Sequence, residues 1–150
     1  ESGVPWRDRS GDELRRRLGI DASTFYDVER VALLPTGFCF PGAGRSGDLP
    51  PRPECAPLWH ARFLSALPSI RLTLLVGRYA QEFHLGPRAK RTLTETVAAF
   101  REYLPTFFPL PHPSPRNRLW AARNPFFERD VVPALRDAVA RSLSDAPEAP

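Results

Sequence analysis

Methionine is absent from this sequence, and lysine is almost absent, since Lys90 is the only lysine among 150 residues. Because the chain begins at Glu1, we expect a start that has been cut or processed. No run approaches the roughly 18 consecutive apolar residues that a membrane-spanning helix needs. The N-terminus also lacks the charged, apolar and small-residue order of a signal peptide. These absences predict a soluble, cytoplasmic protein.

Cysteine is scarce as well, with only Cys39 and Cys55 in the chain. Two cysteines in an intracellular protein rarely form a structural disulfide. The pair therefore has two interpretations. The thiols are either buried apolar side chains or part of a metal site.

The charge is unbalanced toward arginine. The formal net charge is +4, and the isoelectric point is near 9.7. Such a balance favours a polyanionic partner such as nucleic acid, although a GC-rich coding bias produces the same composition. The length, with 42% hydrophobic and 25% charged residues, predicts one domain over residues 1–143 and a disordered tail over 144–150.

Three short apolar runs predict strands. Residues 28–34 (VERVALL) are β-branched and apolar and stop at Pro35. Residues 70–76 (IRLTLLV) form a nearly continuous apolar run, which is typical of a strand buried on both faces of a parallel sheet. A third strand is predicted at 106–110 (TFFPL).

Helical signals lie between and around these runs. A capping-box spacing from Ser10 to Glu13, with Gly19 as the terminating residue, predicts a helix over 10–18 whose arginines 15–17 face solvent. A helix is predicted at 78–85, and a second one from the apolar stripe of Leu58, Ala61, Leu64 and Leu67. A third follows a Thr92–Glu95 capping box and has the stripe Leu93, Val97, Phe100 and Leu104. The last follows an Asn124 cap, has the stripe Phe127, Val131, Leu135 and Val139, and is kinked or restarted at Pro133. Alternating strands and helices predict an α/β fold, a three-layer α/β/α sandwich around a small, mostly parallel central sheet.

Ligands of open α/β sheets bind at the carboxyl ends of the strands. Three segments are expected to converge there: the Pro- and Gly-rich loop 36–56, 77–79 and 111–117. Residues 3–8 would lie at the same end if one further strand preceded them. His112 lies in the last of these, where flanking prolines restrict the backbone, as a recognition or catalytic loop requires. The alternative is a histidine that only hydrogen-bonds nearby backbone.

Other reactive side chains have weaker patterns around them. Ser114 lacks the G-x-S-x-G elbow of a serine hydrolase. His60 and His84 fall on predicted helices without partner ligands, so we expect surface or packing roles for both.

Three ordered segments resemble the uracil-DNA glycosylase superfamily. The loop HPSPRN (112–117) resembles its second signature motif, in the form found in the single-strand-selective monofunctional branch. GVPW (3–6) is similar to the end of its first motif. FCFPGAGRSGDLPPRPEC (38–55) resembles a cysteine-containing stretch of the iron–sulfur branch. The likeness covers most of residues 1–135.

The resemblance implies a uracil-DNA glycosylase-like fold and a monomeric, nucleoid-associated DNA repair enzyme that hydrolyses the N-glycosidic bond of a flipped damaged base, above all uracil. It gives His112 the catalytic role of stabilising the departing base. The other implied site residues are Gly3, Pro5 and Trp6 for the base; Ser114, Pro115, Arg116, Asn117 and Arg45 for DNA; and Cys39 and Cys55 as two of the four ligands of a [4Fe–4S] cluster.

The sequence also departs from the superfamily. The strand and G-x-x-P-G loop that open the first motif, and the second pair of cluster cysteines, have no counterpart here. We therefore expect the water-activating residue to lie upstream of Glu1 and this chain alone to show no measurable turnover. Pro35 stands where the iron–sulfur branch has a uracil-reading asparagine. That change keeps open a noncatalytic nucleic-acid-binding or interaction domain on the same fold; a small-molecule hydrolase would need a phosphate loop that is not seen.

Overall fold

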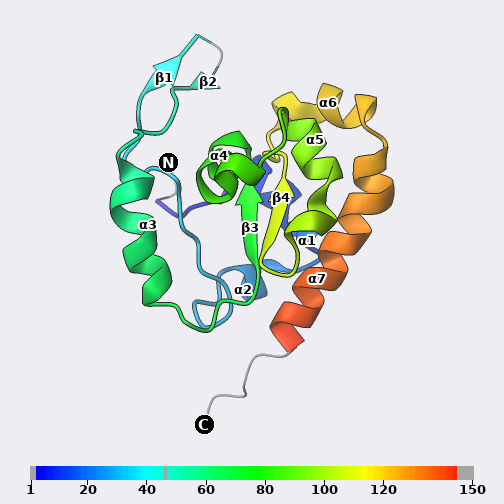
Figure 1. The fold of residues 1–150 in the computed structure, drawn as a ribbon, viewed down its shortest axis with the longest axis horizontal. Coiled ribbons are helices and arrows are strands. Elements are labelled where there is room, and N and C mark those ends of the chain that lie inside the picture. The colour runs from blue at the N-terminus through cyan, green and yellow to red at the C-terminus, as the bar shows by residue number, and fades with distance from the viewer. Residues whose placement is uncertain (1–2, 46, 145–150) are drawn as a thin grey trace.

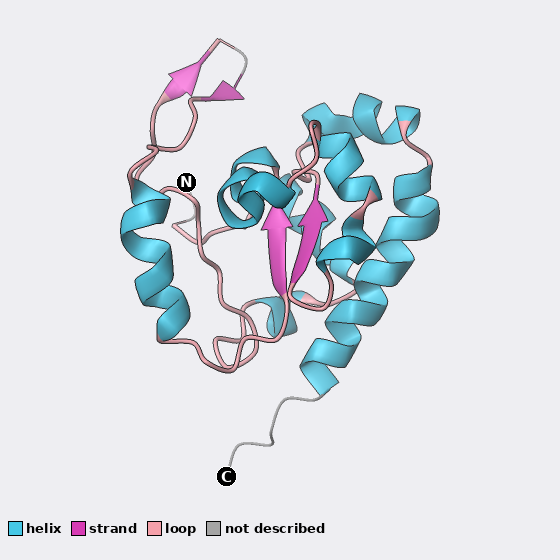
Figure 2. Cartoon of the chain, in the orientation of Figure 1, coloured by secondary structure: helices cyan, strands magenta, loops and turns pink. Residues whose placement is uncertain are grey.

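A pair of parallel strands forms the centre of the fold (Figures 1 and 2). In the computed structural model, which describes residues 3–45 and 47–144, β3 (Thr73–Val76) pairs with β4 (Phe107–Leu110). The register runs from Thr73 opposite Phe107 to Val76 opposite Leu110, so both strands end at the same edge. The strands predicted at 70–76 and 106–110 are confirmed, each with fewer residues.

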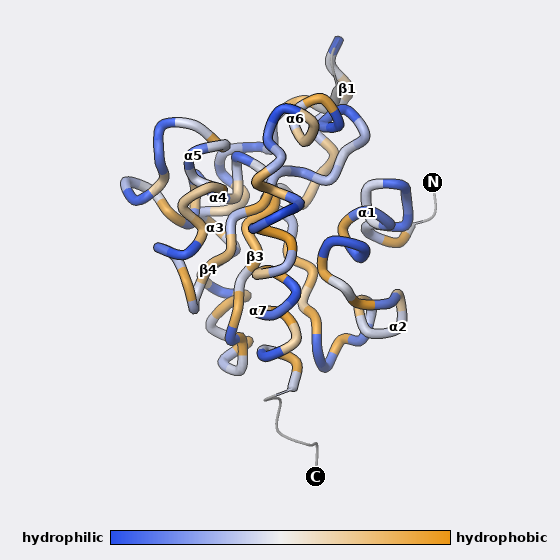
Figure 3. The backbone as a smooth tube through the Cα atoms, turned by 90° about the vertical axis from the view of Figure 1, so that its right-hand side faces the viewer, coloured by the Kyte–Doolittle hydropathy of each residue, from blue (hydrophilic) through white to orange (hydrophobic). Residues whose placement is uncertain are grey.

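Helices lie on both faces of this strand pair. Helix α4 (Arg78–Leu85), with the predicted bounds, lies on one face and α1 (Arg9–Leu18) on the other, while α7 (Val132–Ser144) lies beside β4 (Figures 1 and 3). The predicted three-layer α/β arrangement around a small parallel sheet is confirmed. None of the helices in the described residues is long and apolar enough to cross a membrane.

The remaining elements are one further helix of 11 residues, α3 (Cys55–Ser65), and several shorter helices, turns and strands. The shorter ones are α2 (Ala22–Phe25), β1 (Ala43–Gly44), β2 (Gly47–Asp48), α5 (Leu93–Ala98), α6 (Arg118–Arg123) and the 3-10 turns η1 (Gly86–Arg88), η2 (Phe100–Tyr103) and η3 (Pro115–Asn117). Strands β1 and β2 form an antiparallel hairpin within the loop 36–56, above α3 in Figure 1. Of the predicted tail, residues 145–150 lie outside the described residues, and Ser144 is the last residue of α7.

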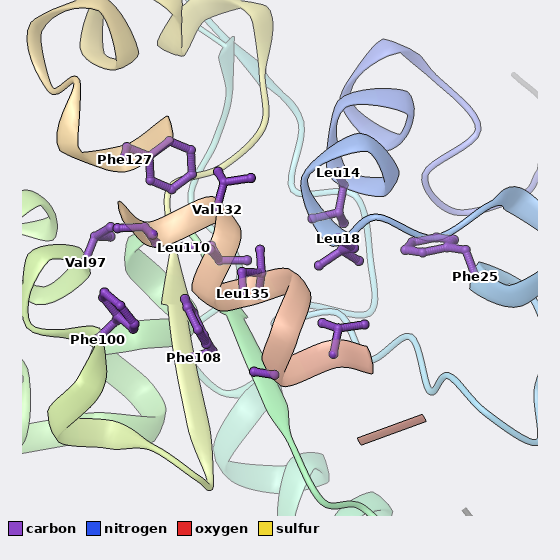
Figure 4. Close-up of a cluster of buried hydrophobic side chains, with 13 residues drawn as sticks. Leu14, Leu18, Phe25, Val97, Phe100, Phe108, Leu110, Phe127, Val132 and Leu135 are labelled. Atoms are coloured by element: carbon purple, nitrogen blue, oxygen red, sulfur yellow. The ribbon is translucent and has the colours of Figure 1, made fainter. Parts of the chain in front are cut away.

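The main core joins the two ends of the chain. Leu14 and Leu18 of α1 pack in one cluster with Phe108 of β4 and with Phe127 and Leu135 near the C-terminus (Figure 4). The predicted stripe of Phe127, Val131, Leu135 and Val139 is buried throughout. A π-helical turn, η4 (Phe127–Val131), precedes α7, where Pro133 supplies no backbone N–H. The predicted restart near Pro133 is thus confirmed.

The predicted strand at 28–34 is wrong. Arg30 and Val31 both donate backbone hydrogen bonds to the carbonyl of Asp27, which makes a turn, and Val28 is 85% exposed. A strand needs a hydrogen-bonded neighbour, and within the described residues β3 pairs with β4 alone. The apolar composition of this segment could not supply that missing partner.

Two predictions about α1 need correction. The helix is capped by Asp8, whose carboxylate accepts a hydrogen bond from the Gly11 amide at 2.8 Å, and not by Ser10. Arg15 is half-buried, and Arg17 is only 5% exposed, so these arginines do not all face solvent. Gly19 does end the helix in the left-handed conformation, at φ 71°.

Three other helix details differ from expectation. The helix predicted from the stripe of Leu58, Ala61, Leu64 and Leu67 is present as α3, but Leu58 is 60% exposed, and Ala56 and His60 form the buried side. The Thr92–Glu95 capping box is present, but α5 ends at Ala98 and continues as η2. Asn124 does not cap the last helix, because its side-chain amide donates to the Trp120 carbonyl at 2.7 Å.

Candidate functional site

A pocket opens at the carboxyl ends of β3 and β4. Its volume is about 700 Å³, and residues from the segments 3–8 and 111–117 line it together. The residues that line it are Trp6, Asp8, Ser10, His112, Ser114, Pro115, Arg116 and Asn117. Four of the predicted DNA-contacting residues, the predicted catalytic histidine and the predicted base-stacking tryptophan therefore share one cavity.

The rings of Trp6 and His112 are stacked in this pocket. Their centroids lie 5.4 Å apart, and the ring planes differ by 29°. His112 as a whole is exposed and Trp6 is half-buried. A flat aromatic surface from the segment 3–8 and an accessible imidazole from the loop 111–117 are thus presented side by side.

The backbone at Trp6 has an unusual conformation. Its φ is 60°, a left-handed value that non-glycine residues rarely adopt. Two contacts hold this segment: the Trp6 carbonyl accepts from Nη1 of Arg15 at 3.2 Å, and the Pro5 carbonyl accepts from the Tyr26 hydroxyl at 2.9 Å. Such conformations persist where surrounding structure fixes them, and they concentrate at functional sites.

The loop 111–117 is anchored by its own residues. Pro111 and Pro113 are fully buried. Asn117 donates from its side-chain amide to the His112 carbonyl at 2.7 Å, and the Ser114 hydroxyl accepts from the Arg116 amide at 3.3 Å. The predicted restriction of this loop is therefore visible in its burial and hydrogen bonds.

Charges in and behind the pocket are arranged around α1. Asp8 is the one acidic side chain among the described residues that line the cavity, and its carboxylate also caps the helix. Behind the pocket, a hydrogen bond from Arg16, helped by Arg17, lowers the pKa of Glu13 to about 2. Glu13 therefore stays ionised and offsets the charge of the buried Arg17 guanidinium.

Some predicted site residues lie elsewhere. Gly3 and Pro5 are exposed neighbours of Trp6 but do not line the pocket, and neither does Arg45, beside the β1–β2 hairpin. Among the described residues, none from the loop 36–56 or from 77–79 lines the pocket, so the expected convergence of these two segments on the cavity is wrong. Asp8 and Ser10 line the cavity without having been singled out as site residues. The local sequence signal for Asp8 is its place directly before the first residue of α1, where aspartate is a common N-cap.

The two cysteines are free thiols, with Cys39 exposed and Cys55 half-buried at the start of α3. A [4Fe–4S] cluster takes four cysteine thiolates. Across residues 3–45 and 47–144, no group of three or more histidine, cysteine, aspartate or glutamate side chains is placed to hold a metal ion. The described residues alone therefore do not fit a cluster, which stays a prediction.

His60 and His84 form a separate pair between α3 and α4. Nδ1 of His60 lies 3.1 Å from Nε2 of His84, and Nε2 of His60 lies 3.0 Å from the carbonyl oxygen of Pro35. A carbonyl only accepts, so His60 donates from Nε2 and, when neutral, accepts at Nδ1 from His84. Burial, followed by the nearby His60, lowers the pKa of His84. The predicted packing role is confirmed for His60, which is buried.

A comparison with protein families gives one match that spans this site. The family described as the Uracil DNA glycosylase superfamily matches residues 1–136. The matched region includes both segments of the pocket and most of the core that joins them.

Proposed function

The chain belongs to the uracil DNA glycosylase superfamily, and on this premise we propose that it binds DNA and hydrolyses the N-glycosidic bond of a damaged base. Uracil is the base that we favour. Enzymes of this kind flip the nucleotide out of the stack before they act on it. The stacked Trp6 and His112 in the pocket are the observation that carries the proposal, because they pair an aromatic surface with a hydrogen-bonding group.

Trp6 would receive the flipped base on its indole face. Stacking of a base on an aromatic side chain contributes about 1 to 3 kcal/mol. The fixed backbone at Trp6 supports this role, because a preformed stacking surface loses little freedom when the base arrives.

His112 would stabilise the base as it leaves. Glycosidic cleavage passes through an oxocarbenium-like sugar, and the base departs with the electron pair of the broken bond as an anion. The imidazole donates a hydrogen bond to a base carbonyl oxygen on which that charge develops. By analogy with a lost oxyanion donor, this contact is worth about 3 kcal/mol in the transition state.

The rest of the loop would hold the DNA. Ser114 and Asn117 can bond phosphate oxygens, and Pro115 with Arg116 can enter the minor groove and fill the vacated stack. Arg45 stands on a different part of the surface and would contact phosphate there.

A noncatalytic DNA-binding domain is the second candidate. Pro35 favours it, because the residue that reads uracil in the iron–sulfur branch is changed. In this structure the Pro35 carbonyl accepts from His60, and Pro35 is not among the residues that line the pocket.

Single-turnover cleavage of oligonucleotides with one uracil separates the two candidates. The protein expressed from its complete gene should release the base, and His112→Ala should slow release by about 100-fold with nearly unchanged DNA affinity. His84→Ala, which alters a histidine outside the pocket, is the matched control. Specific binding without base release would support the noncatalytic domain and contradict the enzyme.

A further inference from the structure

Helix α1 contacts the backbone behind both stacked rings. Arg15 donates from Nη1 to the carbonyl of Trp6 at 3.2 Å. Arg17, two residues further along, donates from Nη1 to the carbonyl of Pro111 at 3.2 Å. One helix thus fixes the segment that presents the indole and the segment that presents the imidazole.

Side chains donate hydrogen bonds to three consecutive backbone carbonyls, the last of which belongs to His112. Gln81, which is buried, donates to Leu110 at 2.9 Å. Arg17 donates to Pro111, and Asn117 donates to His112 at 2.7 Å. The three donors come from α4, α1 and η3. Because prolines at 109, 111, 113 and 115 have no backbone N–H, this segment has few donors of its own.

Burying the charged guanidinium of Arg17 costs desolvation free energy, so stability alone does not explain why an arginine stands here. It is 5% exposed, its guanidinium Nε lies 2.8 Å from Glu13, and its Cζ lies 4.9 Å from the centre of the Phe127 ring. Replacing a buried ion pair with apolar side chains of similar volume is often neutral or stabilising. A buried arginine that also reaches a loop carbonyl points to a role in placing that loop.

We propose that Arg17 is a positioning residue that sets the His112 ring against Trp6, together with Gln81 and Asn117 on the neighbouring carbonyls. The geometric part of this proposal stands on the hydrogen bonds alone. Its catalytic consequence rests on the proposed function. The donors act through the backbone and do not touch the base.

The ring proton on Cε1 of His112 gives a test that does not depend on activity. The stacked indole shifts this NMR signal upfield, His112→Gln identifies it among the three histidines, and Trp6→Leu gives its unstacked position. Arg17→Met should move the signal most of the way to that unstacked position. Arg17→Lys, which keeps a donor, should move it less.

Arg136→Met is the matched control. Arg136 also donates to backbone carbonyls of α1, those of Arg16 at 2.8 Å and Arg17 at 3.4 Å, but does so from α7. Its variant should leave the signal in place. An unmoved signal in folded Arg17→Met, or an equal movement in Arg136→Met, would overturn the proposal.

Asn117→Ala covers the case in which Arg17→Met does not fold. It releases only the His112 carbonyl and should also move the signal, so an unmoved signal in this variant contradicts the proposal. In the cleavage assay, Arg17→Met should lose on the order of 100-fold in single-turnover rate with nearly unchanged DNA affinity. If the wild-type protein releases no base, the proposed function fails, while the NMR result still decides the positioning role.

Discussion

A Cβ atom at position 11 would lie 1.7 Å from the carbonyl oxygen of Trp6. The buried Gly11 in the first turn of α1 and the left-handed Trp6 therefore depend on each other, because any side chain at 11 would occupy the place of the Trp6 backbone. The conformation that presents the indole is fixed by a residue that has no chemistry of its own.

Gly11→Ala should displace Trp6 from His112. The overlap involves backbone and not the flexible end of a side chain, so we expect a loss of about 1 to 3 kcal/mol in unfolding free energy and loss of the stacked ring signal. Denaturant unfolding and the His112 Cε1 proton measure the two effects. Arg9→Ala, at an exposed residue of the same turn, is the control; a Gly11→Ala protein with wild-type values of both would contradict the argument.

The cap at Asp8 predicts a pair of variants. Asp8→Ala should lower the free energy of unfolding by about 1 kcal/mol, because the Gly11 amide loses its acceptor. Asp8→Asn keeps an oxygen that can accept the same bond and should lie close to wild type. Urea unfolding at one pH compares them, and equal losses in both variants would assign the effect to charge and not to the cap.

Arg116 should matter more on duplex DNA than on single strands. A side chain that fills a vacated stack has that role only where two strands are paired. Arg116→Ala should therefore reduce binding or cleavage of duplex substrate preferentially, as measured on matched single- and double-stranded oligonucleotides. Arg123→Ala, an exposed arginine at the end of α6, serves as the control. Equal losses on both substrates would indicate a phosphate contact instead.

His84 gives the protein a pH-dependent stability. Its pKa is lowered in the folded state from the ordinary value of 6.5, so the unfolded chain binds more protons at mildly acidic pH. The free energy of unfolding is therefore highest above the pKa that His84 has in the unfolded chain. It falls as the pH drops from that value toward the lower pKa of His84 in the folded protein. His84→Gln should flatten the fall in unfolding free energy between about pH 7.5 and 5.5. An identical slope in both proteins would exclude His84 as its source.

Local signals predicted the elements that are fixed locally. The bounds of α4, the Thr92–Glu95 capping box, Gly19 and the buried stripe from Phe127 to Val139 all depend on residues within a few positions. The segment 28–34 failed because a strand also needs a partner, and partners are distant in sequence. The stripe of Leu58, Ala61 and Leu64 correctly predicted the helix α3, but spacing does not say which face of a helix meets the core, and here it is the face of Ala56 and His60.

The candidate site was predictable where topology alone places residues. Segments 3–8 and 111–117 meet because both lie at the carboxyl end of the sheet. The partnership of Arg17 with Pro111 was not predictable, because the two residues are 94 positions apart and an arginine on an amphipathic helix ordinarily faces water. The loop 36–56 was expected in the pocket because it follows the predicted strand at 28–34. That strand does not form, so the reason for placing the loop there is lost.

The contact between α1 and α7 determines when α1 can be fully packed as the chain is synthesised. Arg136 donates a hydrogen bond to the carbonyl of Arg16, 120 residues earlier in the chain, and the Arg16 guanidinium forms an ion pair with Glu128 at 2.9 Å. At about 5 to 20 residues per second, a ribosome needs on the order of ten seconds to synthesise that interval. Until then Leu14 and Leu18 lack the part of their core that Phe127, Val132 and Leu135 supply. The leucine face of α1 is therefore fully covered only after translation has reached α7.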